Sequence, residues 1–321
     1  MSSKLLHPPS QLPPAVALEL AKQAPDILGK SPGAVSTSVL QSLLAAPETH
    51  ELWTIYENLL LSCLRIKDGE SAHLCLGRLI NRFGDDNERI MALIGLLKEA
   101  DAPDNATREV VLKEYEQILQ ENPTNIPIFK RRVALLRSLG RVSESVGALI
   151  SLLDISPTDA EAWAELAELY FSQALYSQAV YALEEVLVLQ PNAWNIHARL
   201  GEVLLVAAKI SDAPRQLSEA LKRFSRSIEL CDDYLRGYYG LKLAAGQLLS
   251  EPQRTSKQTD SDGFTVPGPE TLRKLDEVAT EKLAEIVRRS SAGDKGWQGY
   301  DEAEVRAARE LLEKSSRSTV R

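Results

Sequence analysis

The chain has 321 residues, of which 44% are hydrophobic and 26% are charged, and its formal net charge is −8 at pH 7. This composition is typical of a folded protein with enough apolar side chains for a core. The acidic excess argues against general nucleic-acid binding, which needs a basic face. The three cysteines, Cys63, Cys75 and Cys231, are too few and too scattered for a disulfide framework or a zinc site, so we expect reduced thiols.

The chain is expected to begin with a Pro-rich extension over residues 1–34. Prolines at positions 8, 9, 13 and 14 predict that the first dozen residues are extended or disordered, and they interrupt any apolar stretch that could serve as a signal peptide. Short helices are predicted around Ala15–Ala24 and over Val35–Ala46. No apolar run reaches the ~18 residues that a membrane-spanning helix needs, so the sequence indicates a cytosolic protein.

The stretch Thr158–Pro191 consists of two amphipathic helical segments closed by a proline. Its landmarks match the patterns W-x2-L-G-x2-Y and A-x3-F, with Ala for Gly and Leu for Phe: Trp163, Leu166, Ala167, Tyr170, Ala179 and Leu183. The prolines Pro123, Pro157 and Pro191 recur at a spacing of 34 residues. We therefore predict an all-α tetratricopeptide-repeat (TPR) solenoid of antiparallel helix pairs over residues 35–249, with about five repeats and a capping helix.

Local chemistry in this stretch explains the landmarks. Ala167 and Ala179 are small, so the two helices can approach closely, and Trp163 is expected to pack in the core between helices. Thr158 followed by Glu161 has the spacing of a capping box, which predicts that Thr158 starts the first helix.

The neighbouring repeats are less regular. Three degenerate repeats are expected over residues 49–87, 88–123 and 124–157, with Gly84 ending a helix and Gly140 marking a turn. In the repeat that starts at Asn192, an insertion around Ser211–Leu217 is expected to delay the second helix. In that helix Ala220 and Phe224 restore the A-x3-F pattern, and Gly201 occupies the small position.

The remaining residues follow the predicted solenoid. Residues 250–269 are polar and broken by Pro and Gly, and we expect a flexible loop there. Residues 270–321 are predicted to form C-terminal helices, over 270–289 and 301–314, that cap the solenoid or fold back on it.

No pattern in the sequence predicts catalysis. The four histidines are dispersed, none lies in H-E-x-x-H, and no phosphate-binding glycine loop occurs. We therefore expect no enzymatic activity, no cofactor and no metal site.

The expected function is then the binding of a partner protein, since the first helices of successive TPR repeats line a concave groove. Counting equivalent positions in three repeats gives these candidate groove residues: Lys130, Arg137, Ala164, Glu168, Phe171, Asn195, Glu202 and Leu205. Phe171 could anchor a partner in the groove or pack against the neighbouring repeat, and both interpretations stay open.

Co-chaperone TPR domains hold a C-terminal carboxylate with Lys and Asn at set positions of the first helices. Lys130 resembles the first of these, but Ala134 stands where Asn is expected, and Glu165 and Glu168 would repel a carboxylate. This pattern disfavours binding of chaperone tails.

Several segments in order are more specific than the repeat landmarks: residues 52–64, 115–125, 161–187 and 236–245. Together with the delayed fifth repeat, they resemble the family of subunit 2 of the endoplasmic reticulum (ER) membrane protein complex. The resemblance covers residues 48–249 and, more weakly, the helices after 270.

This resemblance implies a non-catalytic cytosolic scaffold that is peripheral to the ER membrane through its partners. It implies a groove that encloses the cytosolic tail of a membrane subunit and another surface that docks a soluble subunit. The complex would insert tail-anchored and multi-pass membrane proteins. A general TPR adaptor or co-chaperone that binds transient peptides is the alternative.

Overall fold

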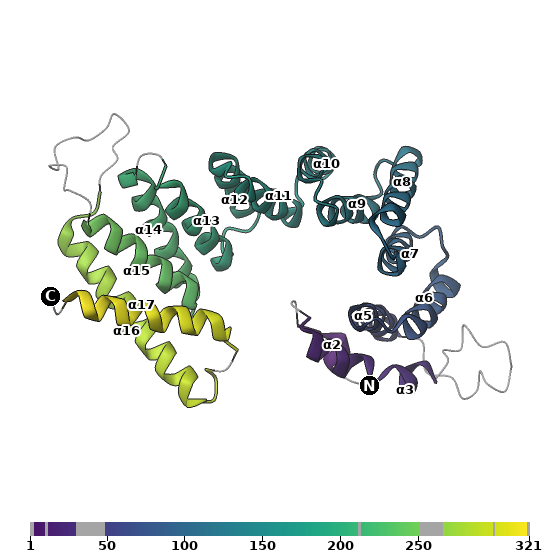
Figure 1. Cartoon of the computed structure of the whole chain (residues 1–321), viewed down its shortest axis with the longest axis horizontal. Coiled ribbons are helices and arrows are strands. Elements are labelled where there is room, and N and C mark those ends of the chain that lie inside the picture. The colour runs from purple at the N-terminus through teal and green to yellow at the C-terminus, as the bar shows by residue number, and fades with distance from the viewer. Residues whose placement is uncertain are drawn as a thin grey trace. The chain divides into compact units, whose positions relative to one another are not determined.

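The computed structural model describes residues 3–9, 12–29, 49–210, 213–250, 266–297 and 299–319. All regular elements in these ranges are helices, and successive helices pair as hairpins (Figure 1). The chain divides into two compact units, Met1–Ile155 and Ser156–Arg321. The prediction of an all-α TPR solenoid is confirmed.

The described residues of the first unit form three short N-terminal helices and three hairpins. Its helices are α1 (Ser3–Leu6), α2 (Pro14–Ala21), α3 (Ala24–Leu28), α5 (His50–Ile66), α6 (Gly69–Phe83), α7 (Glu88–Asp101), α8 (Asn105–Glu121), α9 (Ile126–Ser138) and α10 (Val142–Ile155). As predicted, Gly84 ends α6 and Gly140 lies in the turn after α9, both with positive φ.

The described residues of the second unit form two complete hairpins followed by three further helices. Its helices are α11 (Ala160–Ser172), α12 (Tyr176–Leu189), α13 (Trp194–Ala207), α14 (Ala213–Leu230), α15 (Leu235–Ser250), α16 (Pro269–Ala292) and α17 (Glu302–Thr319). Of the predicted loop 250–269, residues 251–265 lie outside the described residues, as does the whole of the predicted helix 35–46.

The start of α11 differs by one residue from the prediction. Its N-cap is Asp159, whose side chain accepts a hydrogen bond from the Ala162 N–H at 3.0 Å. The predicted cap, Thr158, precedes it. The preceding repeat starts α9 in the same way with Asn125, two residues after its own proline. An Asx side chain in this place satisfies an N–H group that the first turn leaves without a partner.

The N-terminal residues are more ordered than their prolines suggested. Residues Ser3–Leu6 are helical, and the Leu5 side chain is fully buried in the same cluster as α5. The Asn58 side chain of α5 donates to the Leu5 carbonyl at 2.8 Å. Arg78 of α6 donates to the Leu28 carbonyl. Burial of apolar side chains and these hydrogen bonds hold α1 and α3 in place. An extended or disordered segment was therefore the wrong prediction for Ser3–Leu6.

One aromatic ring organises the core of the second unit. Phe224 of α14 is fully buried, with Ala220 one turn before it, which confirms the A-x3-F assignment. A Cβ atom added at Gly201 of α13 would lie 2.8 Å from the Phe224 ring, and one added at Gly240 of α15 would lie 2.1 Å from it. The two glycines therefore let the ring lie directly against the backbones of both helices.

The predicted insertion does not delay α14 as far as expected. The helix begins at Ala213, and Leu217 is 1% exposed within the core. The extra residues lengthen the helix because Leu221 and Leu217 continue its apolar stripe one and two turns N-terminal to Phe224. Residues 211 and 212 lie outside the described part.

Trp163 lies at the edge of the core, so our prediction that it packs inside the core was wrong. The indole is partly buried, its Nε1 donates to the Pro157 carbonyl at 2.9 Å, and its ring centroid lies 6.0 Å from that of the exposed Tyr181. A Trp N–H needs a hydrogen-bond acceptor, and the turn before α11 supplies one.

Helices α16 and α17 complete the core of the second unit. Leu283, Ile286 and Ala308 are fully buried among side chains of the preceding hairpins. Lys242 of α15, only 5% exposed, donates to Asp276 at 2.9 Å and to Thr280 at 2.7 Å, both on α16. This buried ammonium group fixes α16 on α15.

Candidate partner-binding site

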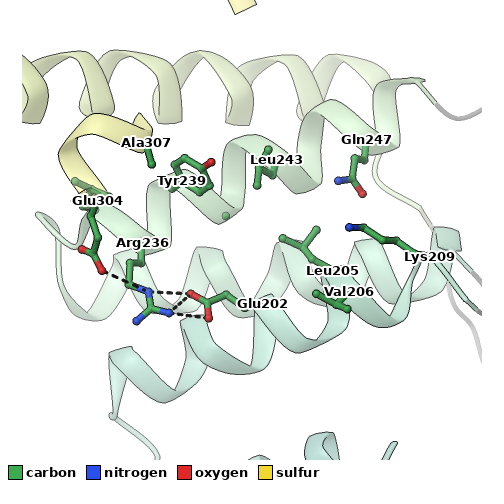
Figure 2. Close-up of a pocket in the computed structure, with 12 residues that line it drawn as sticks. Glu202, Leu205, Val206, Lys209, Arg236, Tyr239, Leu243, Gln247, Glu304 and Ala307 are labelled. Carbon is green, nitrogen blue, oxygen red and sulfur yellow. Dashed lines mark hydrogen bonds and ion pairs between the residues drawn. The ribbon is translucent and has the colours of Figure 1, made fainter. Parts of the chain in front are cut away.

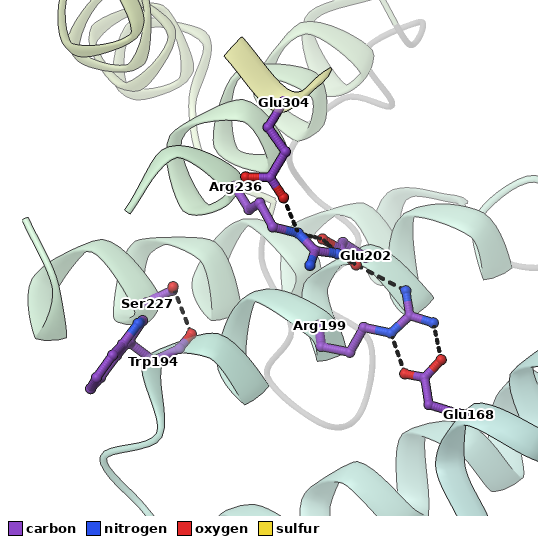
Figure 3. Close-up of polar contacts among 7 residues, drawn as sticks. All are labelled: Glu168, Trp194, Arg199, Glu202, Ser227, Arg236 and Glu304. Carbon is purple, nitrogen blue, oxygen red and sulfur yellow. Dashed lines mark hydrogen bonds and ion pairs between the residues drawn. The ribbon is translucent and has the colours of Figure 1, made fainter. Parts of the chain in front are cut away.

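A series of ion pairs crosses the first helices of successive hairpins in the second unit (Figure 3). Arg199 of α13 contacts Glu168 of α11 at two points, with Nε–Oε1 at 2.6 Å and Nη2–Oε2 at 2.8 Å. Its third nitrogen, Nη1, donates to Glu202 at 2.9 Å, one turn along α13. All the nitrogens of this guanidinium are thus engaged with carboxylates.

The series continues to the C-terminal helix. Arg236 of α15 donates to Glu202 through Nε at 2.9 Å and Nη2 at 2.8 Å. Its Nε also lies 3.9 Å from Glu304 of α17. We call these five residues, Glu168, Arg199, Glu202, Arg236 and Glu304, the ion-pair ladder.

The ladder is partly withdrawn from water, which strengthens its interactions. Burial alone would lower the pKa of Arg199, but the hydrogen bonds that it donates to Glu168 and Glu202 raise this pKa above its ordinary value. Burial raises the pKa of the Glu304 carboxyl, and Arg236 opposes this shift. With three carboxylates and two guanidiniums, the ionised ladder carries one net negative charge.

Phe171 lies beneath the ladder. The Arg199 guanidinium carbon is 4.4 Å from the centre of its ring, and the Tyr176 ring centroid is 5.8 Å away. Because Arg199 belongs to the next hairpin, Phe171 packs against the neighbouring repeat, as one of our two interpretations required. Its use as an anchor for a partner stays a prediction.

A pocket of about 550 Å³ opens beside the ladder, between α13, α15 and α17 (Figure 2). Its lining residues are Glu202, Leu205, Val206, Lys209, Leu235, Arg236, Tyr239, Gly240, Leu243, Gln247, Glu304 and Ala307. Apolar side chains form the middle of the pocket. Glu202, Arg236 and Glu304 lie at one end, and Lys209 and Gln247 lie at the other.

The structure distributes the predicted groove residues over both units. Lys130 and Arg137 are on α9 in the first unit, and the other candidates are on α11 and α13 in the second. Glu202 and Leu205 line the pocket. Glu168 and Phe171 meet at Arg199, whereas Ala164 and Asn195 are absent from the pocket lining.

The prediction missed several pocket residues, and periodicity could have found two of them. Arg236 lies 34 residues after Glu202, and Tyr239 lies 34 residues after Leu205. Extending the count by one repeat would therefore have included α15. Glu304 and Ala307 carried no such signal, because α17 follows no repeat pattern.

Two further features bear on what the site can do. Within the ranges that the structure describes, no group of His, Cys, Asp and Glu side chains could hold a metal ion. In the same ranges, no helix has the length and apolar character of a membrane span.

The helix hairpins, the 34-residue spacing and the A-x3-F pattern define a TPR repeat protein. Residues 73–222 match the family model described as EMC2 TPR-like repeat domain. The chain is 34% identical over 238 residues to TPR repeat protein oca3 of Schizosaccharomyces pombe, covering 72% of this chain and 82% of that protein. It is 31% identical over 237 residues to ER membrane protein complex subunit 2-A of Xenopus laevis, covering 73% and 76%. The chain belongs to the family of ER membrane protein complex subunit 2.

Among solved structures, the chain is similar to the C-terminal part of a TPR repeat-containing protein from Cytophaga hutchinsonii. The TM-score is 0.47 at 12% identity, over 91% of this chain and 98% of that chain.

Proposed function

We propose that this protein is a non-catalytic scaffold subunit of an ER membrane protein complex, and that the pocket between α13, α15 and α17 binds the cytosolic tail of a membrane subunit. Family membership supports the complex. The pocket supports the mode of binding, because it lies on the first-helix side of the hairpins, where TPR proteins form their binding surface. This pocket is the observation that carries the proposal.

The lining of the pocket indicates the chemistry of the bound segment. Leu205, Tyr239 and Leu243 offer an apolar surface for one or more apolar side chains of the tail. Lys209 at one end suits an acidic group of the tail. The net negative ladder at the other end suits a basic group. A short amphipathic segment with an apolar centre fits this arrangement.

The ladder would prepare the pocket for its ligand. Arg236 is held at two points by Glu202 before any partner arrives, so its side chain has little rotamer freedom left to lose on binding. Glu304 brings α17 to the same place. A preformed polar end favours a stable, stoichiometric subunit contact over transient capture of many peptides.

In this proposal the protein acts from the cytoplasmic face of the ER and reaches the membrane through its partners. It would hold cytosolic parts of the complex together while other subunits insert tail-anchored and multi-pass proteins. A second surface would receive a soluble partner subunit.

The proposal is tested by co-purification of tagged full-length variants from detergent-solubilised membranes. Leu243→Asp places a carboxylate in the apolar wall and is expected to reduce recovery of membrane subunits at least tenfold. Val188→Asp is the matched control, because Val188 is 74% exposed on α12 and does not line the pocket. Equal recovery with both variants, or chaperones as the sole partners of the unaltered chain, would contradict the proposal.

A further inference from the structure

The last turn of α16 presents a serine hydroxyl to a guanidinium of α17. Ser291 is exposed, and its Oγ donates to the Val287 carbonyl at 2.6 Å, one turn earlier. The same oxygen accepts a hydrogen bond from Arg309 Nη2 of α17 at 2.8 Å. The hydroxyl therefore lies at the surface and already faces a cation from a different helix.

The residues before Ser291 are basic. Arg288 and Arg289 stand three and two residues before it, and Ser290 intervenes. Protein kinases select substrates partly by charge pattern, and two arginines at these places are the pattern that basic-directed serine kinases recognise. Ser290 lacks an arginine three residues before it, since Val287 occupies that place.

The position in the helix favours access. The helix ends at Ala292, and Gly293 follows with a left-handed φ of 71°. Helix ends open more readily than helix centres, so only the last turn has to unwind for Ser291 to enter a kinase cleft. In that step Arg289 leaves the Trp297 ring, over which its guanidinium carbon lies at 4.8 Å.

We propose that Ser291 is a phosphorylation site and that Arg309 binds the phosphate that it acquires. In the transfer, Ser291 Oγ attacks the γ-phosphorus of ATP held by a basic-directed serine kinase. The bond between that phosphorus and the bridging oxygen breaks, ADP leaves, and the hydroxyl proton passes to the catalytic carboxylate of the kinase.

The phosphate changes the balance of charge between two helices. It adds a charge of roughly −1.5 to −2 at the C-terminal end of α16, where the helix dipole is unfavourable to an anion, and it removes the hydroxyl donor to Val287. Arg309 offsets the added negative charge with a charge-assisted hydrogen bond from α17. Because α17 carries Glu304 and Ala307 of the pocket, the phosphate would clamp one wall of the candidate site.

The acceptor is tested on the purified full-length chain with ATP and the catalytic subunit of a basic-directed serine kinase, with mass spectrometry to locate the phosphate. We expect close to one phosphate per chain on Ser291. Ser291→Ala should lower incorporation at least tenfold, whereas the matched control Ser290→Ala should leave it unchanged. Absence of phosphate from the folded chain, or phosphate on Ser290 instead, would overturn the assignment.

The clamp is tested by hydrogen exchange of α17 in the phosphorylated and unmodified chains. Amides of residues 302–314 should exchange several-fold more slowly after phosphorylation, and Arg309→Gln should abolish this difference. The same slowing with Arg309→Gln, or no slowing in the unaltered chain, would refute the clamp. Neither measurement uses the proposed membrane partners, so the results of both are independent of the proposed function.

Discussion

The carboxylate of Glu202 on α13 holds the guanidinium of Arg236 on α15 at two points, one repeat length along the chain. The same carboxylate accepts from Arg199, so a single acidic side chain joins two arginines across the wall of the pocket. The pocket therefore has a polar end whose geometry is determined by repeat stacking.

We predict that the two arginines of the ladder contribute unequally to stability. The Arg199 side chain is 22% exposed and the Arg236 side chain is 43% exposed, so solvent screens the second more strongly. Arg199→Ala should lower the free energy of unfolding by about 2 kcal/mol, since it also removes the contact with Phe171. Arg236→Ala should cost about 1 kcal/mol or less. Urea denaturation measures both, and a larger loss for Arg236→Ala would contradict the ranking.

The packing of the Phe224 ring against Gly201 and Gly240 gives a second prediction. Gly240→Ala places a methyl group 2.1 Å from the present ring position, so the ring or the backbone must shift, at a cost of about 1–3 kcal/mol. Gly246→Ala is the matched control, because it lies on the same helix and an added Cβ there meets nothing within 4 Å. This control should stabilise the protein by about 0.5–1 kcal/mol through helix propensity. Thermal unfolding of both variants distinguishes the effects. Equal shifts in Tm would show that the Phe224 ring does not pack closely against Gly240.

Lys242 provides a third prediction. Lys242→Ala leaves Asp276 without its buried partner and should cost about 3 kcal/mol, at the low end of the range for buried pairs because Asp276 is 30% exposed. Lys274→Ala removes an exposed pair within α16 and should change stability by less than about 0.5 kcal/mol. Chemical denaturation tests this difference. A Lys242→Ala variant as stable as Lys274→Ala would show that the buried contact does not hold α16.

The buried His197 predicts a dependence of stability on pH. Burial lowers the pKa of His197 from its ordinary value of 6.5, although its Nε2 hydrogen-bonds the Pro191 carbonyl at 3.0 Å. The unfolded chain therefore takes up this proton at a higher pH than the folded chain does. The contribution of the neutral imidazole is present above about pH 6.5 and declines as pH falls below that value.

The measurement compares the free energy of unfolding of the unaltered chain and of His197→Asn between pH 7.5 and about pH 5. The unaltered chain should lose stability as the pH falls, because its unfolded state takes up the His197 proton first. The variant lacks this imidazole and does not lose that stability, so its disadvantage relative to the unaltered chain should shrink. A difference that stays constant, or grows on acidification, would show that His197 does not titrate in this way.

The local parts of the fold were predictable from the sequence. Ala220, Phe224 and Gly201 were assigned correctly because a 34-residue repeat requires small and large side chains at fixed places. The predicted N-cap of α11, Thr158, was one residue too early. Thr158 and Asp159 are both good capping residues, and spacing alone does not choose between them.

The site was less predictable, because it depends on contacts between distant residues. Glu168 and Glu202 were selected by position, but their role as partners of Arg199 required the packing of α11 on α13. The contribution of Glu304 depends on α17 returning to α15, 68 residues after Arg236. Leu5 was misjudged for a similar reason, since burial against α5 outweighs the breaking tendency of nearby prolines.

The central claim is that the pocket between α13, α15 and α17 holds a cytosolic tail of a membrane subunit, and site-specific photo-crosslinking in intact ER membranes tests it most directly. A photoreactive amino acid at position 243 should form one dominant crosslink to a membrane subunit, mapped to its cytosolic tail. The same probe at the exposed position 188 should not form that crosslink. Absence of any membrane-protein crosslink from position 243, or equal yields from both positions, would contradict the claim.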